Sequence, residues 1–213
     1  MPVGYGGSMT VGQLSPTTGR AARRRDRRKS EIVGVALKIL ATSGYQGMSL
    51  EEVAQEADIA KATLYHYFPG KDALVTAALE ALTTDVLDRL RTEVAAASDR
   101  SAYEQLQVLV AEQLHVLTEL YPEVGKLFSF PTSWPQEHGQ SMKSMRRRHD
   151  EIFRVVVERG VASGDFDCPD PGVALHCLQG LLNHASVWLR PANDPDGARA
   201  RAVIDAGMRL FAR

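Results

Sequence analysis

Apolar residues recur at helical spacing along most of the chain. In the first periodic segment, from about residue 26, the positions i, i+3, i+4, i+7 and i+8 are occupied by Ile32, Val35, Ala36, Ile39 and Leu40. This spacing predicts a helix with one apolar face, and Gly44 is expected to end it. Because no segment shows the alternating pattern of a β-strand, the sequence predicts an all-α protein.

Two short helices are expected next. Ser49 is predicted to be the N-cap of the first, with Glu52 completing a capping box. The second covers about residues 60–67, with Leu64 and Phe68 as its inward pair. Pro69 and Gly70 interrupt the pattern there. Three short helices with a tight turn between the second and third predict a helix-turn-helix motif over residues 49–68.

Longer helices are predicted in the rest of the chain. The first runs from about residue 71 to 97 and would span about 40 Å at 1.5 Å per residue. Further helices are expected at about residues 101–121, 140–163, 171–189 and 196–212, with a short helical turn after Pro122. Residues 130–139, which include Pro131 and Pro135, are expected to form a loop or a broken helix.

Charge is distributed unevenly over the 213 residues. The formal net charge is only −1, but a basic run precedes the first apolar helix, and it contains Arg20, Arg23, Arg24, Arg25, Arg27, Arg28 and Lys29 with only Asp26 among them. The residues before this run are rich in Gly, Ser, Thr and Pro and carry no charge. Residues 1–24 are therefore expected to be a disordered tail with a basic end, which either attracts DNA phosphates or only promotes solubility.

The outward side chains of the predicted third helix suit DNA. On a helical wheel Ala62 and His66 point outward, with Thr63 and Tyr65 on the flanks. A small residue lets a helix enter the major groove closely, and the Thr63 hydroxyl or methyl can meet base edges. Tyrosine hydroxyls can donate to phosphate oxygens, and Lys71 adds a charge at a helix N-terminus.

The stretch "ALKILATSGYQGMSLEEVAQEADIAKATLYHYFPGKDAL" resembles the DNA-binding domain of the TetR family of transcriptional regulators. The resemblance covers about residues 25–85 and implies that Lys61, Ala62 and Thr63 approach base edges. It also implies that three residues hold phosphates, namely Tyr65, Tyr67 and Lys71. The expected DNA contacts also include Arg27, Arg28 and His66, and the role of His66 stays open.

Two positions depart from the family pattern. Asp58 stands where such proteins more usually have Gly, and Gly70 stands where they more usually have Ser or Asn. The second departure removes a capping side chain, so the start of the long helix is expected to depend on Pro69 and backbone geometry.

The resemblance further implies that residues 86–213 form a ligand-binding and dimerisation domain, whose last two helices pack against a partner's. Apolar residues of the helix at 171–189 are expected to meet that partner: Leu175, Leu178, Leu181, Leu182, Ala185 and Trp188. Ligand-cavity candidates are His115, Phe128, Trp134, Phe153, Gln179 and Asn183. The polar stripe of His176, Gln179 and Asn183 either is a solvated or interface-edge face or lies partly in the cavity lining. The aromatic residues belong either to the core or to the cavity wall.

The C-terminal sequence from Arg146 onwards loosely resembles the TetR-type regulators that respond to acyl-coenzyme A thioesters and lipids. If that resemblance holds, the phosphates of the carrier would meet one or more of Arg146, Arg147, Arg148 and Arg154. The alternative is that these arginines form a solvated surface.

Other classes of function find little support in the sequence. No catalytic motif, cofactor fingerprint or metal-ligand spacing occurs, so neither an enzyme nor a cofactor is expected. No apolar run is long enough to span a membrane, so a cytoplasmic protein is expected, with Cys168 and Cys177 as free thiols.

The sequence therefore predicts a homodimeric DNA-binding regulator, most simply a repressor released from a pseudo-palindromic double-stranded operator by a small hydrophobic effector. Two alternatives stay open: an architectural DNA-binding protein without effector, and an all-α lipid-binding protein.

Overall fold

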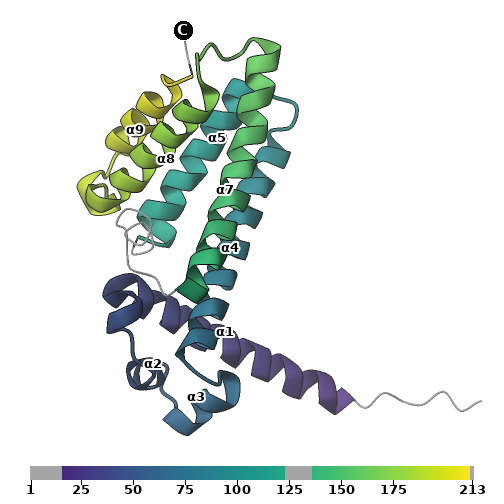
Figure 1. Ribbon diagram of the computed structural model, residues 1–213, viewed down its shortest axis with the longest axis vertical. Coiled ribbons are helices and arrows are strands. Elements are labelled where there is room, and N and C mark those ends of the chain that lie inside the picture. The colour runs from purple at the N-terminus through teal and green to yellow at the C-terminus, as the bar shows by residue number, and fades with distance from the viewer. Residues whose placement is uncertain (1–15, 123–135, 212–213) are drawn as a thin grey trace, which may run out of the picture.

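The structure, a computed structural model, describes residues 16–122 and 136–211, and all regular elements in these ranges are helices. The elements in order are α1 (Pro16–Gly47), α2 (Leu50–Glu56), α3 (Lys61–Tyr67), α4 (Lys71–Ala96), α5 (Ala102–His115), η1 (Val116–Leu120), α7 (Gln136–Ser163), α8 (Pro171–Trp188), η2 (Pro191–Asn193) and α9 (Ala198–Met208). Figure 1 shows α1, α2 and α3 at one end, with α4 and α7 running from there into the helical body. The predicted all-α fold with an N-terminal helix-turn-helix unit is confirmed.

Helix α1 begins ten residues earlier than expected, because the segment expected to lie in a disordered tail is helical from Pro16. Ala and Arg are strong helix formers even without burial. Farther along α1, beyond the expected start, Glu31 accepts a 2.8 Å hydrogen bond from Arg28 and lies 3.6 Å from Arg27. The first turns project away from the body in Figure 1. The rest of the expected tail, residues 1–15, lies outside the described residues.

The short helices follow the sequence closely. Gly44 has φ +68° and breaks α1 as expected, although one more helical turn follows it. Ser49 caps α2 by accepting a 3.1 Å hydrogen bond from the amide of Glu52. Leu64 and Phe68 are buried beneath α3, as predicted.

Several predicted boundaries are wrong in the C-terminal half. The helix expected to reach residue 121 changes at Val116 into the π-helical turn η1, which sequence periodicity does not distinguish from an α-helix. Helix α7 starts at Gln136, so residues 136–139 are helical and not a loop. Helix α9 is shorter than expected at both ends, and at its start Asp194 accepts hydrogen bonds from the amides of Arg199 and Ala200. The turn expected after Pro122 lies outside the described residues.

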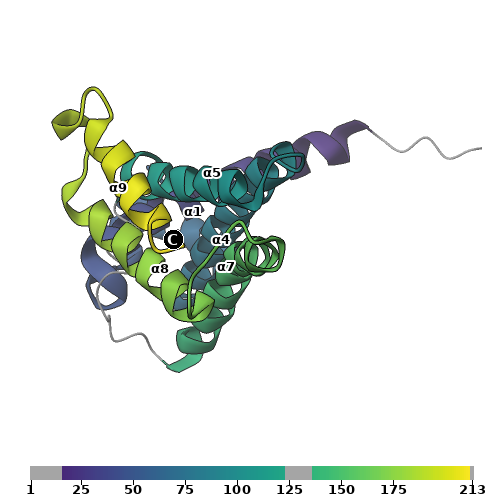
Figure 2. The same ribbon diagram turned by 90° about the horizontal axis from the view of Figure 1, so that it is seen from above.

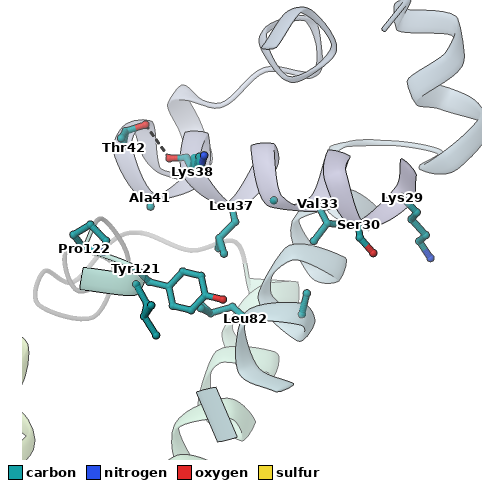
Figure 3. A pocket seen from close by; sticks show the side chains of 13 residues that line it. Lys29, Ser30, Val33, Leu37, Lys38, Ala41, Thr42, Leu82, Tyr121 and Pro122 are labelled. Atoms are coloured by element: carbon teal, nitrogen blue, oxygen red, sulfur yellow. Dashed lines mark hydrogen bonds between the residues drawn. The ribbon is translucent and has the colours of Figure 1, made fainter. Parts of the chain in front are cut away.

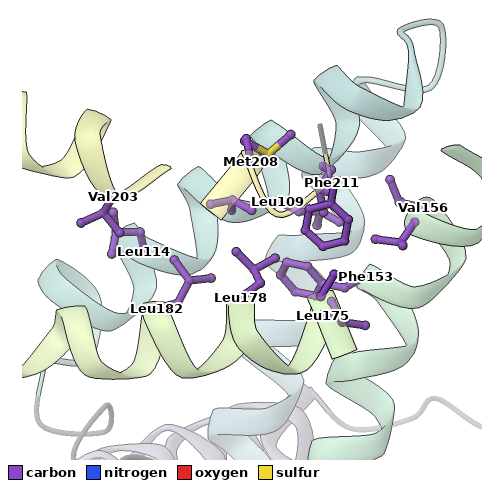
Figure 4. Packing of buried hydrophobic residues seen from close by; sticks show 14 of the residues in the cluster. Leu109, Leu114, Phe153, Val156, Leu175, Leu178, Leu182, Val203, Met208 and Phe211 are labelled. Atoms are coloured by element: carbon purple, nitrogen blue, oxygen red, sulfur yellow. The ribbon is translucent and has the colours of Figure 1, made fainter. Parts of the chain in front are cut away.

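The buried side chains form two apolar clusters, and α4 contributes to both. Its first half, from Leu74 to Leu82, packs with α1, α2 and α3, whereas Leu90 packs with the C-terminal helices. Val86 packs against both clusters. Figure 4 shows the second cluster, where α8 residues meet Phe153 and Phe211. Figure 2 shows α4, α5, α7, α8 and α9 grouped together. The boundary expected at residues 85 and 86 therefore falls inside one continuous helix.

Candidate DNA interface and ligand cavity

Helix α3 exposes most of the residues expected to face DNA. Ala62, Tyr65 and His66 are exposed, Tyr65 to 46%, while Thr63 and Tyr67 are half-buried. On the outward side of α3, the small residue Ala62 is therefore surrounded by hydrogen-bonding and aromatic side chains. Such a surface suits a helix that enters the major groove.

Two lysines of this surface already have partners on neighbouring helices. The ammonium of Lys61 pairs with the carboxylate of Glu51 on α2. The ammonium of Lys71 lies 4.5 Å from the centre of the Tyr45 ring, a cation–π arrangement, and the Tyr45 hydroxyl donates to Asp72. Lys71 is thus held against α1 at the first turn of α4.

The turn between α2 and α3 has a left-handed residue. Asp58 has φ +50°, and it is the one non-glycine residue with positive φ in the part of the chain described. Arg28 donates a 3.2 Å hydrogen bond to the backbone carbonyl of Asp58. The usual glycine at this position in the family is explained by the left-handed backbone, and Arg28, predicted as a DNA contact, is seen to bind the turn.

The basic arm of α1, its residues 20–29, faces the end of α3, the recognition helix of the motif. Arg20, Ala21, Arg24 and Arg25 line a shallow hollow together with Tyr67. Guanidinium groups and a tyrosine hydroxyl are good donors for phosphate oxygens. Arg27 is exposed on the same arm and pairs only weakly with Glu31, across 3.6 Å.

A cavity of about 330 Å³ lies between α4, α5 with η1, α7 and α8. Its lining consists of Leu82, Thr83, Val86, Leu87, Gln113, Val116, Leu117, Met145, Arg146, His149, Asp150, His176, Gln179, Gly180 and Asn183. Its size is at the lower end of the range for small-molecule sites. All three residues of the polar stripe on α8 line this cavity, and His176 is also exposed to solvent.

The other predicted ligand residues lie elsewhere. His115 does not line this cavity and sits 3.3 Å from Glu119. Phe153 is fully buried in the second apolar cluster, and Phe128 and Trp134 lie outside the described residues. His115 was predicted to line the cavity only because it lies on the same stretch of helix as Gln113 and Leu117. Those two residues do line the cavity, whereas His115 points away from it.

The sequence did not predict that His149 and Asp150 line the cavity. The His149 Nε2 atom is 2.9 Å from the side-chain oxygen of Gln113, and its Nδ1 atom is 3.3 Å from Asp150. The ring also lies 5.1 Å from that of Phe153. The available signal was the spacing from His149 to Phe153, which places the two on one face of α7.

A second hollow, of about 670 Å³, lies between α1, α4 and the end of η1. Figure 3 shows Leu37, Leu82 and Tyr121 meeting there, and Leu82 lines the C-terminal cavity as well. Beside it, Asp85 accepts hydrogen bonds from Tyr121 (2.9 Å) and Arg89 (2.8 Å). Burial raises the pKa of the Asp85 carboxyl, but the bonds to Arg89 and Tyr121 outweigh it and hold that pKa below its usual value.

The outer face of α8 carries exposed apolar side chains, including Val173 at 57% and Trp188 at 44%. By contrast, four of the residues expected to meet a partner are buried in the chain's own core: Leu175, Leu178, Leu182 and Ala185. Periodicity marked the inward face of α8 correctly but could not tell which neighbour covers it. Val173, Cys177, His184, Val187 and Trp188 form the exposed face.

Disulfides, metal sites and membrane-spanning helices also bear on the class of function. Cys168 and Cys177 are free thiols. No set of three potential metal ligands gathers among the residues described. Likewise, none of the helices in the described ranges combines the length and the apolarity needed to cross a membrane.

The helical fold and the surface of α3 define a helix-turn-helix DNA-binding regulator. The chain belongs to the TetR family: residues 32–78 match the model "Bacterial regulatory proteins, tetR family", and residues 99–208 match the model "Tetracyclin repressor-like, C-terminal domain". Members of this family are non-enzymatic DNA-binding proteins.

Known relatives agree with this assignment. The transcriptional repressor KstR2 of Rhodococcus jostii is 26% identical over 86% of this chain and 87% of that protein. The regulator RutR of Escherichia coli is 31% identical over 56% of this chain and 54% of RutR. Among solved structures, PfmR of Thermus thermophilus has 27% identity and a TM-score of 0.64, covering 85% of this chain and 99% of PfmR. FadR of Bacillus subtilis, solved with stearoyl-CoA, shares the fold at 17% identity and a TM-score of 0.69, covering 85% of this chain and 98% of FadR.

Proposed function

We propose that this chain is a homodimeric, cytoplasmic repressor that leaves a pseudo-palindromic operator when a small, mainly hydrophobic effector enters the C-terminal cavity. The observation that carries the proposal is the course of α4. It starts at Lys71, beside the recognition helix, and its middle, from Leu82 to Leu87, lines the cavity. A ligand that moves the cavity wall therefore acts on the helix that supports α3.

On the DNA side, α3 enters the major groove with Ala62 and Thr63 nearest the bases. Tyr65, Tyr67 and Lys71 bind flanking phosphates. The arginines of the α1 arm, which line the hollow at Tyr67, extend the phosphate contacts beyond the motif. In a dimer two such helices read half-sites about 34–36 Å apart.

The exposed face of α8 supports the dimer. Val173, Val187 and Trp188 are exposed on one helix, and a self-complementary pairing of this face with a partner's would bury them. Helix α9 packs beside α8 and completes the proposed four-helix contact.

The effector is proposed to be mainly apolar because α4 and η1 line the cavity with aliphatic side chains. The named repressor KstR2 supports the repressor reading, and the FadR complex with stearoyl-CoA shows that this fold can bind an acyl-coenzyme A. Of the arginines proposed for carrier phosphates, Arg146 lines the cavity. Arg154 instead pairs with Glu151 and Glu158, which weakens its candidacy.

Fluorescence anisotropy with operator and random duplexes tests the DNA side. Lys71→Ala and Tyr65→Phe should weaken binding to both duplexes, and the lysine change should reduce the salt slope by about 1. Changes at Thr63 should alter sequence preference instead. Lys143→Ala, an exposed lysine on α7, is the matched control and should change neither. Equal losses for operator and random DNA on changing Thr63 would contradict its role.

Thermal-shift measurements test the effector class. Acyl-coenzyme A species should raise the melting temperature and lower operator affinity, because a ligand that prefers one state shifts the equilibrium toward it. Stabilisation by unrelated apolar compounds but by no acyl-coenzyme A would reject the acyl-coenzyme A variant of the proposal.

A further inference from the structure

The C-terminal cavity has one apolar wall and one polar wall. Helix α4 and η1 contribute mainly aliphatic side chains: Leu82, Val86, Leu87, Val116 and Leu117. Helices α7 and α8 contribute mainly polar ones: Arg146, His149, Asp150, His176, Gln179 and Asn183. A ligand that fills the space must therefore be amphipathic across its width.

One group on the polar wall lacks a partner. The side-chain nitrogen of Gln179 is buried and makes no hydrogen bond within the described residues. His149, in contrast, has Gln113 and Asp150 on its two ring nitrogens. A buried donor without an acceptor costs free energy, and native proteins contain few of them.

Because the unpaired atom is the amide nitrogen of Gln179, the kind of partner it requires is known. A side-chain amide nitrogen offers two N–H donors and no lone pair, so its partner must be an acceptor. Gln179 itself lines the cavity, so an acceptor atom of a ligand in this space can be its partner.

Resting on the function proposed above, we infer that the part of the effector that enters this cavity is a compact apolar group with a carbonyl-type oxygen at one edge, to which Gln179 donates a hydrogen bond. The apolar body of the ligand lies against Leu82, Val86 and Leu87 of α4. The polar edge decides which molecules bind, and the apolar body acts on the helix that leads to Lys71.

The direct test is a titration of the isotopically labelled full chain with three probes of similar shape. Cyclohexyl methyl ketone carries a neutral carbonyl, cyclohexanecarboxylate carries an anionic acceptor, and isopropylcyclohexane carries no oxygen. The side-chain amide proton signals of Gln179, assigned by their loss in Gln179→Met, should move downfield with the ketone and not with the hydrocarbon. A shift with the carboxylate alone would narrow the class to acids and uphold the acceptor requirement.

Two substitutions sharpen the test. Gln179→Met removes the orphan donor at similar volume and should lower ketone affinity roughly tenfold, leave hydrocarbon binding unchanged and not reduce the melting temperature of the free protein. Gln179→Glu replaces the donor by an acceptor at the same shape and should abolish ketone binding. Gln107→Met, at an exposed glutamine of α5 outside the cavity, is the matched control and should change none of these values.

The inference is overturned if Gln179→Met weakens ketone and hydrocarbon equally, if the amide signals of Gln179 stay fixed, or if the free protein loses stability on that change. Operator release is measured separately. Probes that bind through Gln179 without releasing DNA would uphold the site and reject the effector role of the cavity.

Discussion

The guanidinium of Arg28 donates a 3.2 Å hydrogen bond to the backbone carbonyl of Asp58, thirty residues away in sequence. The bond joins the basic arm of α1 to the turn between α2 and α3, at the residue whose φ is +50°. A side chain predicted from the sequence to contact DNA therefore binds the turn that joins the two helices of the motif.

This contact predicts how substitutions at the turn change stability. Asp58→Ala should be less stable than Asp58→Gly by about 1 kcal/mol, because a Cβ disfavours the left-handed region and alanine lacks the local hydrogen bonding that aspartate offers there. Arg28→Met should lower the free energy of unfolding, whereas Arg27→Met, at the neighbouring exposed arginine, should not. Urea unfolding followed by circular dichroism measures all four. Equal stability of the alanine and glycine variants would contradict the strain argument.

The Glu51–Lys61 ion pair predicts an increase in DNA affinity. Glu51→Gln frees the ammonium of Lys61 at the start of α3 and removes a negative charge near the phosphates, so affinity should rise several-fold at low salt and the salt dependence should steepen by about one contact. Glu56→Gln removes the same charge from the exposed side of α2 without releasing Lys61. Anisotropy titrations over a range of salt should separate the two, and an identical slope for both would show that the freed ammonium of Lys61 makes no ionic contact with DNA.

The start of α4 offers a capping substitution. Gly70 is the N-cap and makes no side-chain bond to the helix, its backbone is extended, and a Cβ there would meet no atom within 4 Å. Gly70→Ser should therefore stabilise the protein by roughly 0.5–1 kcal/mol through a cap and a less flexible unfolded chain. Gly70→Ala supplies only the second effect, so thermal unfolding of the pair isolates the cap.

The Tyr121–Asp85 bond predicts a change in acid stability. The pKa of Asp85 is lowered on folding, so this carboxylate stabilises the fold above its unfolded pKa of about 3.9, and the contribution is lost as pH falls toward the folded value. Tyr121→Phe removes one of the two donors, so the pKa of Asp85 should rise and the loss of stability below about pH 4 should become shallower. Carboxyl carbon NMR of Asp85 measures the shift, and an unchanged pKa would show that Arg89 alone sets it.

Helical periodicity located what burial determines. Leu64 and Phe68, the long helix from Lys71 and the inward face of α8 were all predictable, since apolar spacing records which side of a helix meets other atoms. The resemblance to the TetR family also allowed the outward residues of α3 to be predicted, because the residue types of that motif occur at fixed positions.

Contacts between distant segments were not predictable. The cavity combines side chains from four helices, and nothing local distinguishes Gln179, which lines it, from His115, which does not. The bond from Arg28 to Asp58 depends on the same kind of information. The inward leucines of α8 were wrongly assigned to a partner, because leucine spacing shows that a face is covered but not whether the cover is the same chain or another.

The sharing of α4 between the two apolar clusters has a consequence for how the molecule comes apart. A fragment ending at residue 85 would cut this helix between Leu82 and Leu90. The second apolar cluster would then lose the part of α4 that packs against it. We expect the backbone amides near Val86 to exchange with solvent only on global unfolding. The DNA-reading end and the cavity would then melt in a single transition, and limited proteolysis of the native chain would not release either half intact.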